Sequence, residues 1–502
     1  MRLSKSKYCQ GIQCPKILWM HRAMPEEFDD ACMNRSALET GDMVGDLAMG
    51  YYGDFVEVPY AEDKALMLDE TRRLIEEGTP VIAEASFAFE GNFCSVDILL
   101  DEGDGVRIVE VKSSTKPKPI YLHDMAYQCY MVSSCGFKVK SVSLMHLNSQ
   151  YARQGDLDLQ QLFIVEDHTD DVLAMQQDIP AAIERIRAVA AQEEEPQMDI
   201  GVQCANPYPC GFKKHCWAHL PERSVFDLPK AHMTTKVARY LEGVVTFRDL
   251  IDANVELKGL QAPMVACEEL GADCIFDFEQ VEAFLDTLSM PLYFLDFETF
   301  QQAIPQWDGV RPYQQIPFQY SLHIKEDADA ALQHREFLAK EGEDPRRALA
   351  ERLCEDVPAD VCVVAYNISF EKTRIKELAE LFPDLAEHLL SLADNLRDLM
   401  VPFGSGACYL RDMKGSCSIK AVLPAMCPDD PELDYHNLEG ISNGGEAMCA
   451  YETLHLQAPE DIERIRRQLL AYCRLDTLAM VKVLEKLFDM YAARKLEREI
   501  GE

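Results

Sequence analysis

An apolar run that delivers two carboxylates, residues 292–300 with the sequence Leu-Tyr-Phe-Leu-Asp-Phe-Glu-Thr-Phe, constrains the fold of this chain more than any other feature. Its β-prone residues predict a buried strand. Side chains two residues apart in a strand point to the same face, so Asp296 and Glu298 project together. Adjacent carboxylates repel each other, and a divalent cation commonly relieves this repulsion. The run therefore predicts a metal site at the end of a strand.

Two later motifs supply further groups for such a site. Residues 361–371 predict a second apolar strand that leads into Asn367, Phe370 and Glu371. Residues 472–476 place Tyr472 and Asp476 four positions apart, on one face of a helix. An isolated Asp-x-Glu after a strand is more often a loop cap. Three motifs in this order, spread over about 180 residues, favour a joint site instead.

Together these motifs resemble the DEDD exonucleases of the RNase H-like fold, which include the DnaQ-type proofreading domains. The Tyr-x3-Asp spacing is similar to the tyrosine subtype of that family. The resemblance implies that Tyr472 orients the attacking water and that four carboxylates hold two Mg²⁺ (or Mn²⁺) ions roughly 3.5 to 4 Å apart: Asp296, Glu298, Glu371 and Asp476. Glu371 departs from the family, whose second motif normally ends in aspartate. Asp398 is a further acid, expected to end an apolar helix and to be structural.

Eighteen cysteines are present, and most stand alone in apolar surroundings, which is typical of small buried side chains. Cys204, Cys210 and Cys216 instead share one short segment that contains prolines and aromatic residues. Disulfides are not expected in a reducing compartment, so clustered thiols indicate metal. Three thiolates are one short of a tetrahedral zinc site or an iron–sulfur cluster. Cys14, followed by a proline and an apolar helix start, is the candidate fourth ligand, with Cys9 as a competitor.

One early and three late cysteines that bracket a nuclease core resemble the iron–sulfur RecB-type nucleases. These include the CRISPR-associated RecB-like exonucleases and the AddB nuclease domain. The resemblance implies a [4Fe-4S] cluster, held by Cys14, Cys204, Cys210 and Cys216, that joins the two ends of the domain. Spacing alone leaves structural Zn²⁺ open as the alternative.

The segment between the cysteines carries a second acidic motif. Residues 81–89, 93–100 and 106–111 predict three consecutive strands. A helix is expected at 123–133, a further strand at 140–147 and an amphipathic helix at 178–191. The three strands carry Glu84, Asp97 and the string Glu110-x-Lys112, which is the PD-(D/E)xK nuclease pattern. In this pattern Asp97 and Glu110 bind Mg²⁺. Lys112, on the same strand face as Glu110, polarises or deprotonates the attacking water.

Two features qualify this second site. Gln128 and Tyr130, on the helix expected at 123–133, match the RecB-type Gln-and-Tyr motif loosely. The early helix of that family often carries a metal-binding histidine, and residues 41–48 have none. Asp46 or Glu84 is the candidate substitute.

The net charge of −37 opposes nucleic acid as a partner, because phosphate contacts need Lys and Arg. Net charge averages over the surface, however, whereas a binding groove is local. Local basic groups exist, and the simplest interpretation of each is a solvated face: Lys112, Lys116 and Lys118, and then Arg464, Arg466, Arg467 and Arg474. Nucleic acid, DNA in preference to RNA, remains the expected partner, and the sequence names no protein partner.

The length of 502 residues predicts two to three domains of an α/β protein. The resemblances imply a RecB-like domain of the restriction-endonuclease-like fold at 1–220, a helical connector at 221–285 and an RNase H-like DEDD domain at 286–502. No apolar run approaches the ~18 to 20 residues of a membrane span. The N-terminus lacks the apolar core of a signal peptide, so a cytoplasmic protein without membrane contact is expected.

Two hypotheses about function follow. The first is a metal-dependent nuclease acting on DNA, a 3′→5′ exonuclease through the C-terminal domain with a second, RecB-like site. The alternative is a nucleic-acid-binding or assembly protein with one or both sites inactive, or an exonuclease directed at RNA. The missing histidine, Glu371 and the acidity favour the alternative. The intact set of Asp296, Glu298, Tyr472 and Asp476 favours the nuclease.

Overall fold

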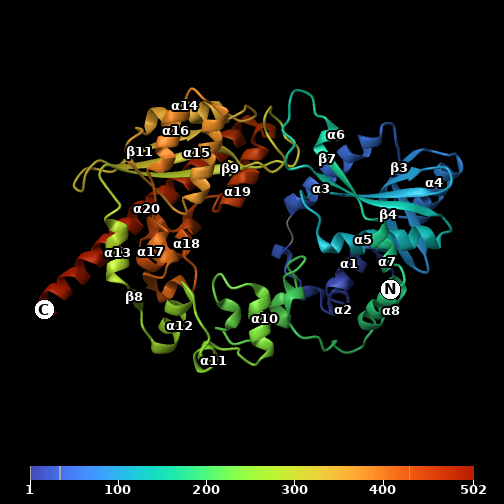
Figure 1. Ribbon diagram of the computed structural model, residues 1–502, viewed down its shortest axis with the longest axis horizontal. Helices are drawn as coiled ribbons and strands as arrows, with labels where there is room; N and C mark the ends of the chain where they lie inside the picture. The colour runs from blue at the N-terminus through green and yellow to red at the C-terminus, as the bar shows by residue number, and fades with distance from the viewer. Residues whose placement is uncertain (1, 33–34, 429, 502) are drawn as a thin grey trace. The chain divides into compact units, whose positions relative to one another are not determined.

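The computed structural model describes residues 2–32, 35–428 and 430–501 (Figure 1). The chain is a mixed α/β protein that divides into two compact units. Unit 1 comprises Met1–Leu220 and Gln302–Gln314, and unit 2 comprises Pro221–Gln301 and Gln315–Glu502. Within the described residues, no helix is both long enough and apolar enough to cross a membrane.

Unit 1 is built on a seven-stranded sheet in the order β2-β3-β4-β5-β6-β7, with a short β1 parallel to β4. Strands β3, β4 and β5 form an antiparallel meander, and β5 and β6 are parallel. The strands are β1 Leu3–Ser4, β2 Val56–Glu57, β3 Val81–Phe89, β4 Asn92–Asp101, β5 Val106–Lys112, β6 Val139–Leu147 and β7 Phe163–Asp167. The strands predicted at 81–89, 93–100, 106–111 and 140–147 are thus confirmed.

Helices cover both faces of this sheet. They are α1 Lys5–Gln13, α2 Lys16–Ala23, α3 Arg35–Met49, α4 Lys64–Glu76, α5 Pro119–Ser134, α6 Leu159–Leu162, α7 Thr169–Met175, α8 Ile179–Ala190 and α9 Lys213–Cys216. Alternation in β5 separates the two cores, because Ile108 packs with the α5 side whereas Val109 packs with the α3 side. Helix α5 begins four residues before its predicted start, since Pro119 opens its first turn.

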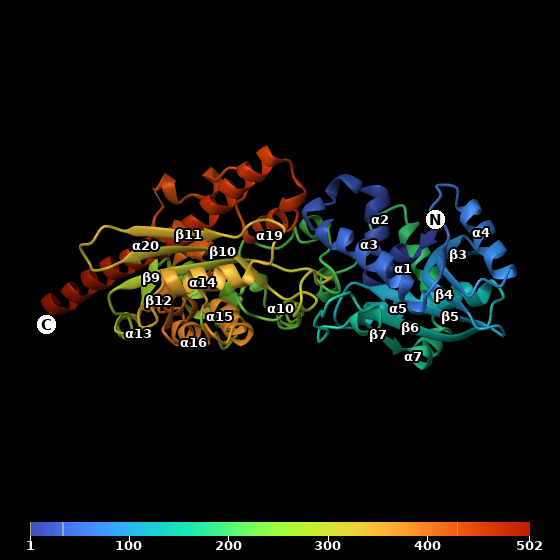
Figure 2. The ribbon, with the colours of Figure 1, turned by 90° about the horizontal axis from the view of Figure 1, so that it is seen from above.

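Unit 2 is built on a five-stranded sheet in the order β11-β10-β9-β12-β13 (Figure 2). The first three strands are antiparallel, and β9, β12 and β13 are parallel. The strands are β9 Leu292–Phe300, β10 Ile316–Lys325, β11 Gln333–Leu338, β12 Cys362–Ala365 and β13 Leu396–Asp398, with a separate antiparallel pair of β8 Cys274–Phe276 and β14 Cys408–Leu410.

The helices of unit 2 pack on the two faces of the larger sheet and around the smaller one. They are α10 Met233–Leu241, α11 Phe247–Asp252, α12 Gln261–Leu270, α13 Phe278–Leu285, α14 Arg346–Asp356, α15 Ser369–Leu381, α16 Ala386–Asp394, α17 Val401–Gly404, α18 Ile419–Met426, α19 Gly444–Glu452 and α20 Pro459–Gly501. The segment expected as a helical connector, 221–285, contains α10 to α13. It shares one core with α18 and α20, so it belongs to unit 2.

Strand β9 shows why this sheet can carry the acidic site. One set of its alternate residues packs against α14, α15 and α16: Tyr293, Leu295 and Phe297. The other set packs on the side of α20: Leu292 and Phe294. Asp296 and Glu298 continue this second set along the strand. The apolar half of β9 therefore anchors the strand in two cores, and its polar half lies beside α20.

Candidate metal sites

Four carboxylates from three parts of unit 2 line one pocket. Asp296 and Glu298 come from β9, Glu371 from the first turn of α15, and Asp476 from the middle of α20. Tyr472, one turn before Asp476, lines the same pocket. The structure thus brings together all three motifs that the sequence singled out.

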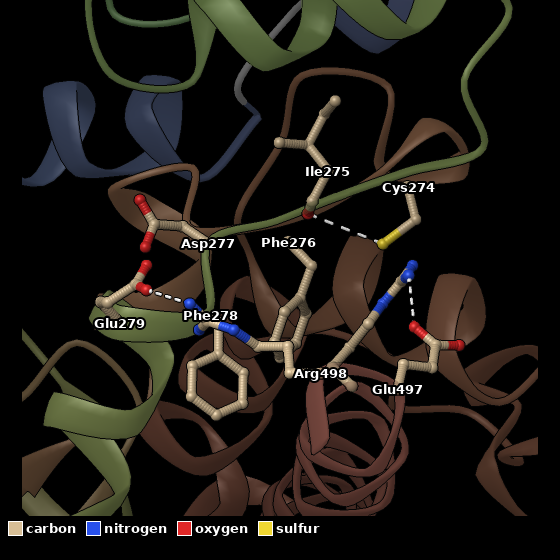
Figure 3. Close-up of a pocket in the computed structure, with 9 residues that line it drawn as sticks. Cys274, Ile275, Phe276, Asp277, Phe278, Glu279, Glu497 and Arg498 are labelled. Carbon is tan, nitrogen blue, oxygen red and sulfur yellow. Dashed lines mark hydrogen bonds and ion pairs between the residues drawn. The ribbon is translucent and has the colours of Figure 1, made fainter. Parts of the chain in front are cut away.

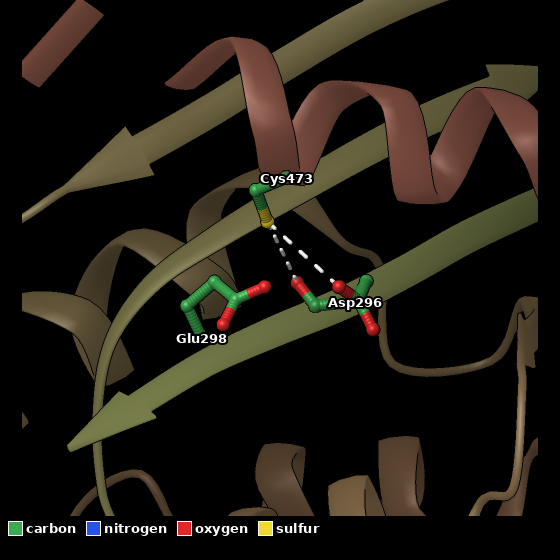
Figure 4. A group of neighbouring side chains, drawn as sticks. All are labelled: Asp296, Glu298 and Cys473. Carbon is green, nitrogen blue, oxygen red and sulfur yellow. Dashed lines mark hydrogen bonds between the residues drawn. The ribbon is translucent and has the colours of Figure 1, made fainter. Parts of the chain in front are cut away.

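Helix α20 places a thiol directly beside the two carboxylates of β9. Figure 4 shows Cys473 above the strand, between Asp296 and Glu298. One ligand atom from each of these three residues lies within 4.8 Å of the others. The Sγ atom of Cys473 is 3.9 Å from Oδ2 of Asp296 and 3.8 Å from its backbone oxygen. Sequence reasoning missed Cys473, and its only signal was its position next to Tyr472.

Burial and mutual repulsion make negative charge costly in this pocket. Glu298, Glu371 and Asp476 are 7%, 3% and 8% exposed. Burial, with the charge of Asp476, raises the pKa of Glu298 to about 8, and burial, with Asp398, raises the pKa of Glu371 to about 8. Burial also raises the pKa of Asp476 to about 6. For Asp296, burial and then the neighbouring carboxylates raise the pKa well above its usual value.

The donor types of these groups suit a hard divalent cation. Among the described residues, the ligand atoms within 4.8 Å of one another are those of Asp296, Glu298 and Cys473, and Glu371 and Asp476 line the same pocket beyond that distance. The Oε2 atom of Glu371 is buried and has no hydrogen-bond partner among the described residues. Leaving such an oxygen unsatisfied costs about 1–3 kcal/mol, so the position favours an additional ligand. A set of carboxylate oxygens is the donor type preferred by Mg²⁺ and Mn²⁺.

Asp398 has a different role from these four. It was expected to end an apolar helix, and that expectation is wrong because it ends strand β13. Its Oδ1 accepts the backbone N–H groups of Asn367 and Met400, each at 2.9 Å. These bonds fix the turns that follow β12 and β13, which makes Asp398 structural.

Two further side chains of the pocket region were missed in the sequence. The hydroxyl of Tyr435 donates to Oδ1 of Asp476 at 2.5 Å. The ammonium of Lys420, at the start of α18, donates to the Tyr472 hydroxyl at 3.3 Å. Both lie tens of residues before α20, so no local spacing linked them to the third motif.

Unit 1 gathers a second polar cluster on β4 and β5. The Oδ2 atom of Asp97 accepts the backbone N–H of Val111 at 2.7 Å. The ammonium of Lys112 contacts the carboxylate of Glu110, and Nε2 of Gln128 donates to the same carboxylate at 2.6 Å. The strand pair therefore brings together the Asp and Glu-x-Lys elements, and α5 adds the glutamine.

Two charged groups of this cluster were not found in the sequence. The Nζ atom of Lys5 lies 3.2 Å from Asp97 and 3.1 Å from Glu110, across about a hundred residues of chain. Asp124 accepts from Lys112 at 2.9 Å. A signal for Asp124 existed, because it precedes Gln128 by four residues on one face of a helix. No spacing signal existed for Lys5.

The lysines determine the electrostatics of this cluster. Burial, followed by the charge of Glu110, raises the pKa of Asp97 to about 6. Burial alone would raise the pKa of Glu110, but the adjacent Lys112 and Lys5 hold it below its usual value. Glu110 is therefore a buried carboxylate that the chain itself keeps charged.

Glu84 has an unusual backbone conformation. Its φ of 55° lies in the left-handed region, although it stands within β3. Its neighbours Ala83 and Ala85 pair with Ile98 and Val96, which leaves Glu84 opposite Asp97. Burial and then the charge of Asp97 raise its pKa to about 7. Strained residues of this kind concentrate at functional sites. The other candidate substitute, Asp46, is exposed on α3.

The four candidate cysteines Cys14, Cys204, Cys210 and Cys216 line a single pocket of unit 1. Cys14 follows α1, and Gln13 beside it donates to the backbone oxygens of Gln203 and Tyr208, both at 2.8 Å. Burial, and then the nearby thiols, raise the pKa of Cys210 to about 11. Thiolates are the donor type of both zinc and iron–sulfur sites. Among the described residues, no three of these four sulfur atoms lie within 4.8 Å of one another. The competitor Cys9 packs against the core of the sheet instead.

A different pocket of unit 2 lies between β8, the start of α13 and the end of α20 (Figure 3). Its two arginines are engaged in ion pairs, Arg498 with Glu279 at 2.8 Å and Arg494 with Glu497 at 3.0 Å. Its charges are thus largely compensated within the chain, which distinguishes it from the pocket of four carboxylates.

Residues 293–418 match a family profile described as a domain of unknown function (DUF2779). The chain is similar to an uncharacterized protein, UU173, of Ureaplasma parvum serovar 3, with 26% identity over 42% of this chain and 33% of that protein. It is also similar to the uncharacterized protein MG366 of Mycoplasma genitalium, with 25% identity over 39% of this chain and 32% of the relative. The match spans about a third of the length of these curated relatives.

Proposed function

We propose that unit 2 hydrolyses phosphodiester bonds of nucleic acid in a metal-dependent reaction, as a 3′→5′ exonuclease that acts on DNA. The convergence of four carboxylates, three of them buried, and Tyr472 in one pocket carries this proposal. The sheet of unit 2, with three antiparallel strands followed by two parallel ones, supports the resemblance to RNase H-like exonucleases.

The residues of the pocket have different roles in the proposed reaction. The four carboxylates would hold Mg²⁺ or Mn²⁺, which supplies an activated water and neutralises charge on the leaving oxygen. The Tyr472 hydroxyl orients the attacking water. Tyr435 fixes the Asp476 carboxylate through Oδ1. Three of the four carboxylates are buried, and the low dielectric around them strengthens these electrostatic interactions.

For unit 1 we propose a RecB-like PD-(D/E)xK nuclease site of the restriction-endonuclease-like fold. Asp97 and Glu110 would be the Mg²⁺ ligands, with Lys112 beside the attacking water. Gln128 holds the Glu110 carboxylate in place. Cys14, Cys204, Cys210 and Cys216 would hold a [4Fe-4S] cluster, with structural Zn²⁺ as the alternative, which supplies a covalent connection between α1 and the late cysteine segment.

One observation favours a second role for unit 1, nucleic-acid binding without cleavage. The ammonium groups of Lys5 and Lys112 both contact Glu110, so the chain already compensates part of the charge that a metal ion would neutralise. Unit 1 would then bind the substrate while unit 2 cleaves it.

A cleavage assay on the purified full-length protein tests the main proposal. End-labelled single- and double-stranded DNA and RNA are incubated with Mg²⁺, Mn²⁺ or EDTA. We expect stepwise shortening from the 3′ end that needs metal and that Asp296→Ala abolishes, whereas Asp360→Ala, at an exposed site outside the pocket, cleaves like the parent. Tyr472→Phe should lower kcat by about a hundredfold with little change in binding. Absence of cleavage on every substrate, or full activity of Asp296→Ala, would refute the proposal.

A further inference from the structure

Lys420 is the one positively charged side chain among the described residues that line the acidic pocket. Its Nζ atom donates to the backbone oxygen of Ser442 at 2.9 Å and to the Tyr472 hydroxyl at 3.3 Å. It also lies over the rings of Tyr435 and Tyr472, 4.8 and 4.9 Å from their centroids. These contacts hold a normally flexible lysine in one place beside the carboxylates.

The ammonium retains binding capacity. It has three N–H donors, and two have partners among the described residues. The third donor and the positive charge remain for a ligand in the pocket. A metal cation would be repelled by this group, so the matching ligand atom is an anionic oxygen.

The start of α19 completes the same side of the pocket. Ser442, which holds Lys420, lies two residues before Gly444, the first residue of α19, and Gly444 and Gly445 line the pocket without side chains. A Cβ atom on Gly444 would lie 3.7 Å from Oε2 of Glu298 and 3.9 Å from the Tyr472 hydroxyl. The glycine therefore leaves space next to the carboxylates.

We propose that Lys420, beside the space left at Gly444, binds a non-bridging oxygen of the terminal phosphodiester of a single-stranded nucleic acid. Such a phosphate carries the charge that the four carboxylates repel, and Lys420 offsets that repulsion while the phosphate approaches a cation. This inference rests on the proposed nuclease function and names the substrate group that its pocket recognises.

Binding measurements separate this role from a purely structural one. Fluorescent single-stranded DNA and RNA oligonucleotides are titrated with the full-length protein in Ca²⁺, under conditions where they stay uncut, over a series of salt concentrations. Lys420→Met should weaken binding about tenfold or more. It should also flatten the slope of log K against log salt by about 0.7, the contribution of one phosphate contact on a single strand.

Three further variants complete the design. Lys420→Arg keeps the charge and should restore most of the affinity. Lys486→Met, exposed on α20 outside the pocket, should match the parent. Gly444→Val changes no charge but fills the space beside Glu298, so it should weaken binding like Lys420→Met, and it also tests the site if Lys420→Met folds poorly.

The outcomes distinguish the two proposals. If the parent protein cleaves, but Lys420→Met and Gly444→Val bind with unchanged affinity and salt slope, Lys420 acts only on Tyr472 and the phosphate site is wrong. If the parent neither cleaves nor binds nucleic acid, the proposed function fails and this inference fails with it.

Discussion

Glu371 is the residue at which the proposed resemblance to the DEDD exonucleases would place an aspartate. It belongs to the first turn of α15, and its carboxylate still reaches the pocket shared by β9 and α20. One oxygen is buried without a partner among the described residues. The extra methylene therefore extends a helix-borne carboxylate into the site, where its ionised form needs a cation.

This arrangement predicts a pH-dependent stability in the absence of metal. Glu371 has a folded pKa of about 8 against an ordinary value of 4.5. The folded protein thus binds this proton more tightly than the unfolded chain, and the stability gained is complete below about pH 4.5 and is lost as the pH rises to about 8. In EDTA we expect Tm to fall from pH 6 to pH 9, and to fall less for Glu371→Gln, which cannot ionise.

The pKa shift of Glu371 sets how much the parent and Glu371→Gln should differ in the pH dependence of their stability. Each pKa unit corresponds to about 1.4 kcal/mol, so the parent and Glu371→Gln should differ by a few kcal/mol in their pH dependence. Mg²⁺ should restore the parent at pH 9, because it neutralises the ionised carboxylate. Thermal unfolding curves that shift in parallel for the two proteins would contradict this explanation.

At the scale of elements, helix α1 joins the two polar sites of unit 1. Its first residue, Lys5, contacts Asp97 and Glu110, and Cys14 follows its last residue. Nine helical residues, about 1.5 Å apart along the axis, thus separate the cysteine pocket from the acidic cluster.

Removal of the Lys5 ammonium should destabilise unit 1. Lys5→Met removes the ammonium that contacts Asp97 and leaves the fully buried Glu110 with Lys112 as its contacting ammonium among the described residues. Breaking a buried ion pair costs up to 3–5 kcal/mol, and we expect about 2 kcal/mol here because Lys112 stays in place. Urea unfolding measures this change. Lys7→Met, exposed on the same helix, is the control and should have no effect. Equal stability of the two variants would show that Lys5 is dispensable.

Loss of one candidate cluster ligand should affect both colour and stability. Anaerobically purified protein should be brown with broad absorption near ~400 nm, as thiolate-bound iron requires. Cys210→Ala should remove the colour and lower the Tm of unit 1, because the bound group would connect α1 to the late cysteine segment. Cys362→Ala, a buried cysteine on β12 of unit 2, should keep the colour. If the parent protein is colourless and contains stoichiometric zinc, the bound metal is zinc and not iron.

The elements that the sequence predicted are those with a strong local pattern. Alternation and apolar runs placed β3, β4, β5 and β9 almost to the residue, and with them Asp97 and Asp296. Lys5 and Lys420 were not predicted as site residues because only tertiary packing brings them to their sites. Lys5 is 92 residues from Asp97 in the chain, and Lys420 is 52 residues from Tyr472. Asp124 could have been predicted, because it lies four residues before Gln128 on one face of a helix.

At the scale of the whole molecule, the chain passes between the units three times. Residues 302–314 lie between β9 and β10 of unit 2 but belong to unit 1. There Tyr313 donates to the backbone oxygen of Ser113 at 2.7 Å, and Ala303 joins the core that contains Val81 and Met145. No feature of composition distinguishes residues 302–314 from the strands on either side, so their assignment to unit 1 could not be predicted from the sequence.

Because residues 302–314 belong to unit 1, we expect residues 1–220 alone to be an incomplete domain. A fragment of residues 1–220 should be less stable than the same fragment extended through a flexible linker by residues 302–314. The side chains of that segment bury apolar surface, and we expect a difference of about 3 kcal/mol. Thermal unfolding of the two fragments measures it. A further fragment carrying Tyr313→Ser in the added segment should recover only part of the gain, and identical Tm values for all three would refute the prediction.

The position of residues 302–314 also determines when unit 1 can complete its folding during synthesis on the ribosome. The last part of unit 1 emerges only after the connector helices and strand β9 of unit 2 have been made. At about 5–20 residues per second, the first 220 residues wait on the order of ten seconds for their missing segment. During that interval the core around Val81 and Met145 lacks part of its cover. The nascent chain therefore passes through a stage at which a chaperone has an exposed apolar surface to bind.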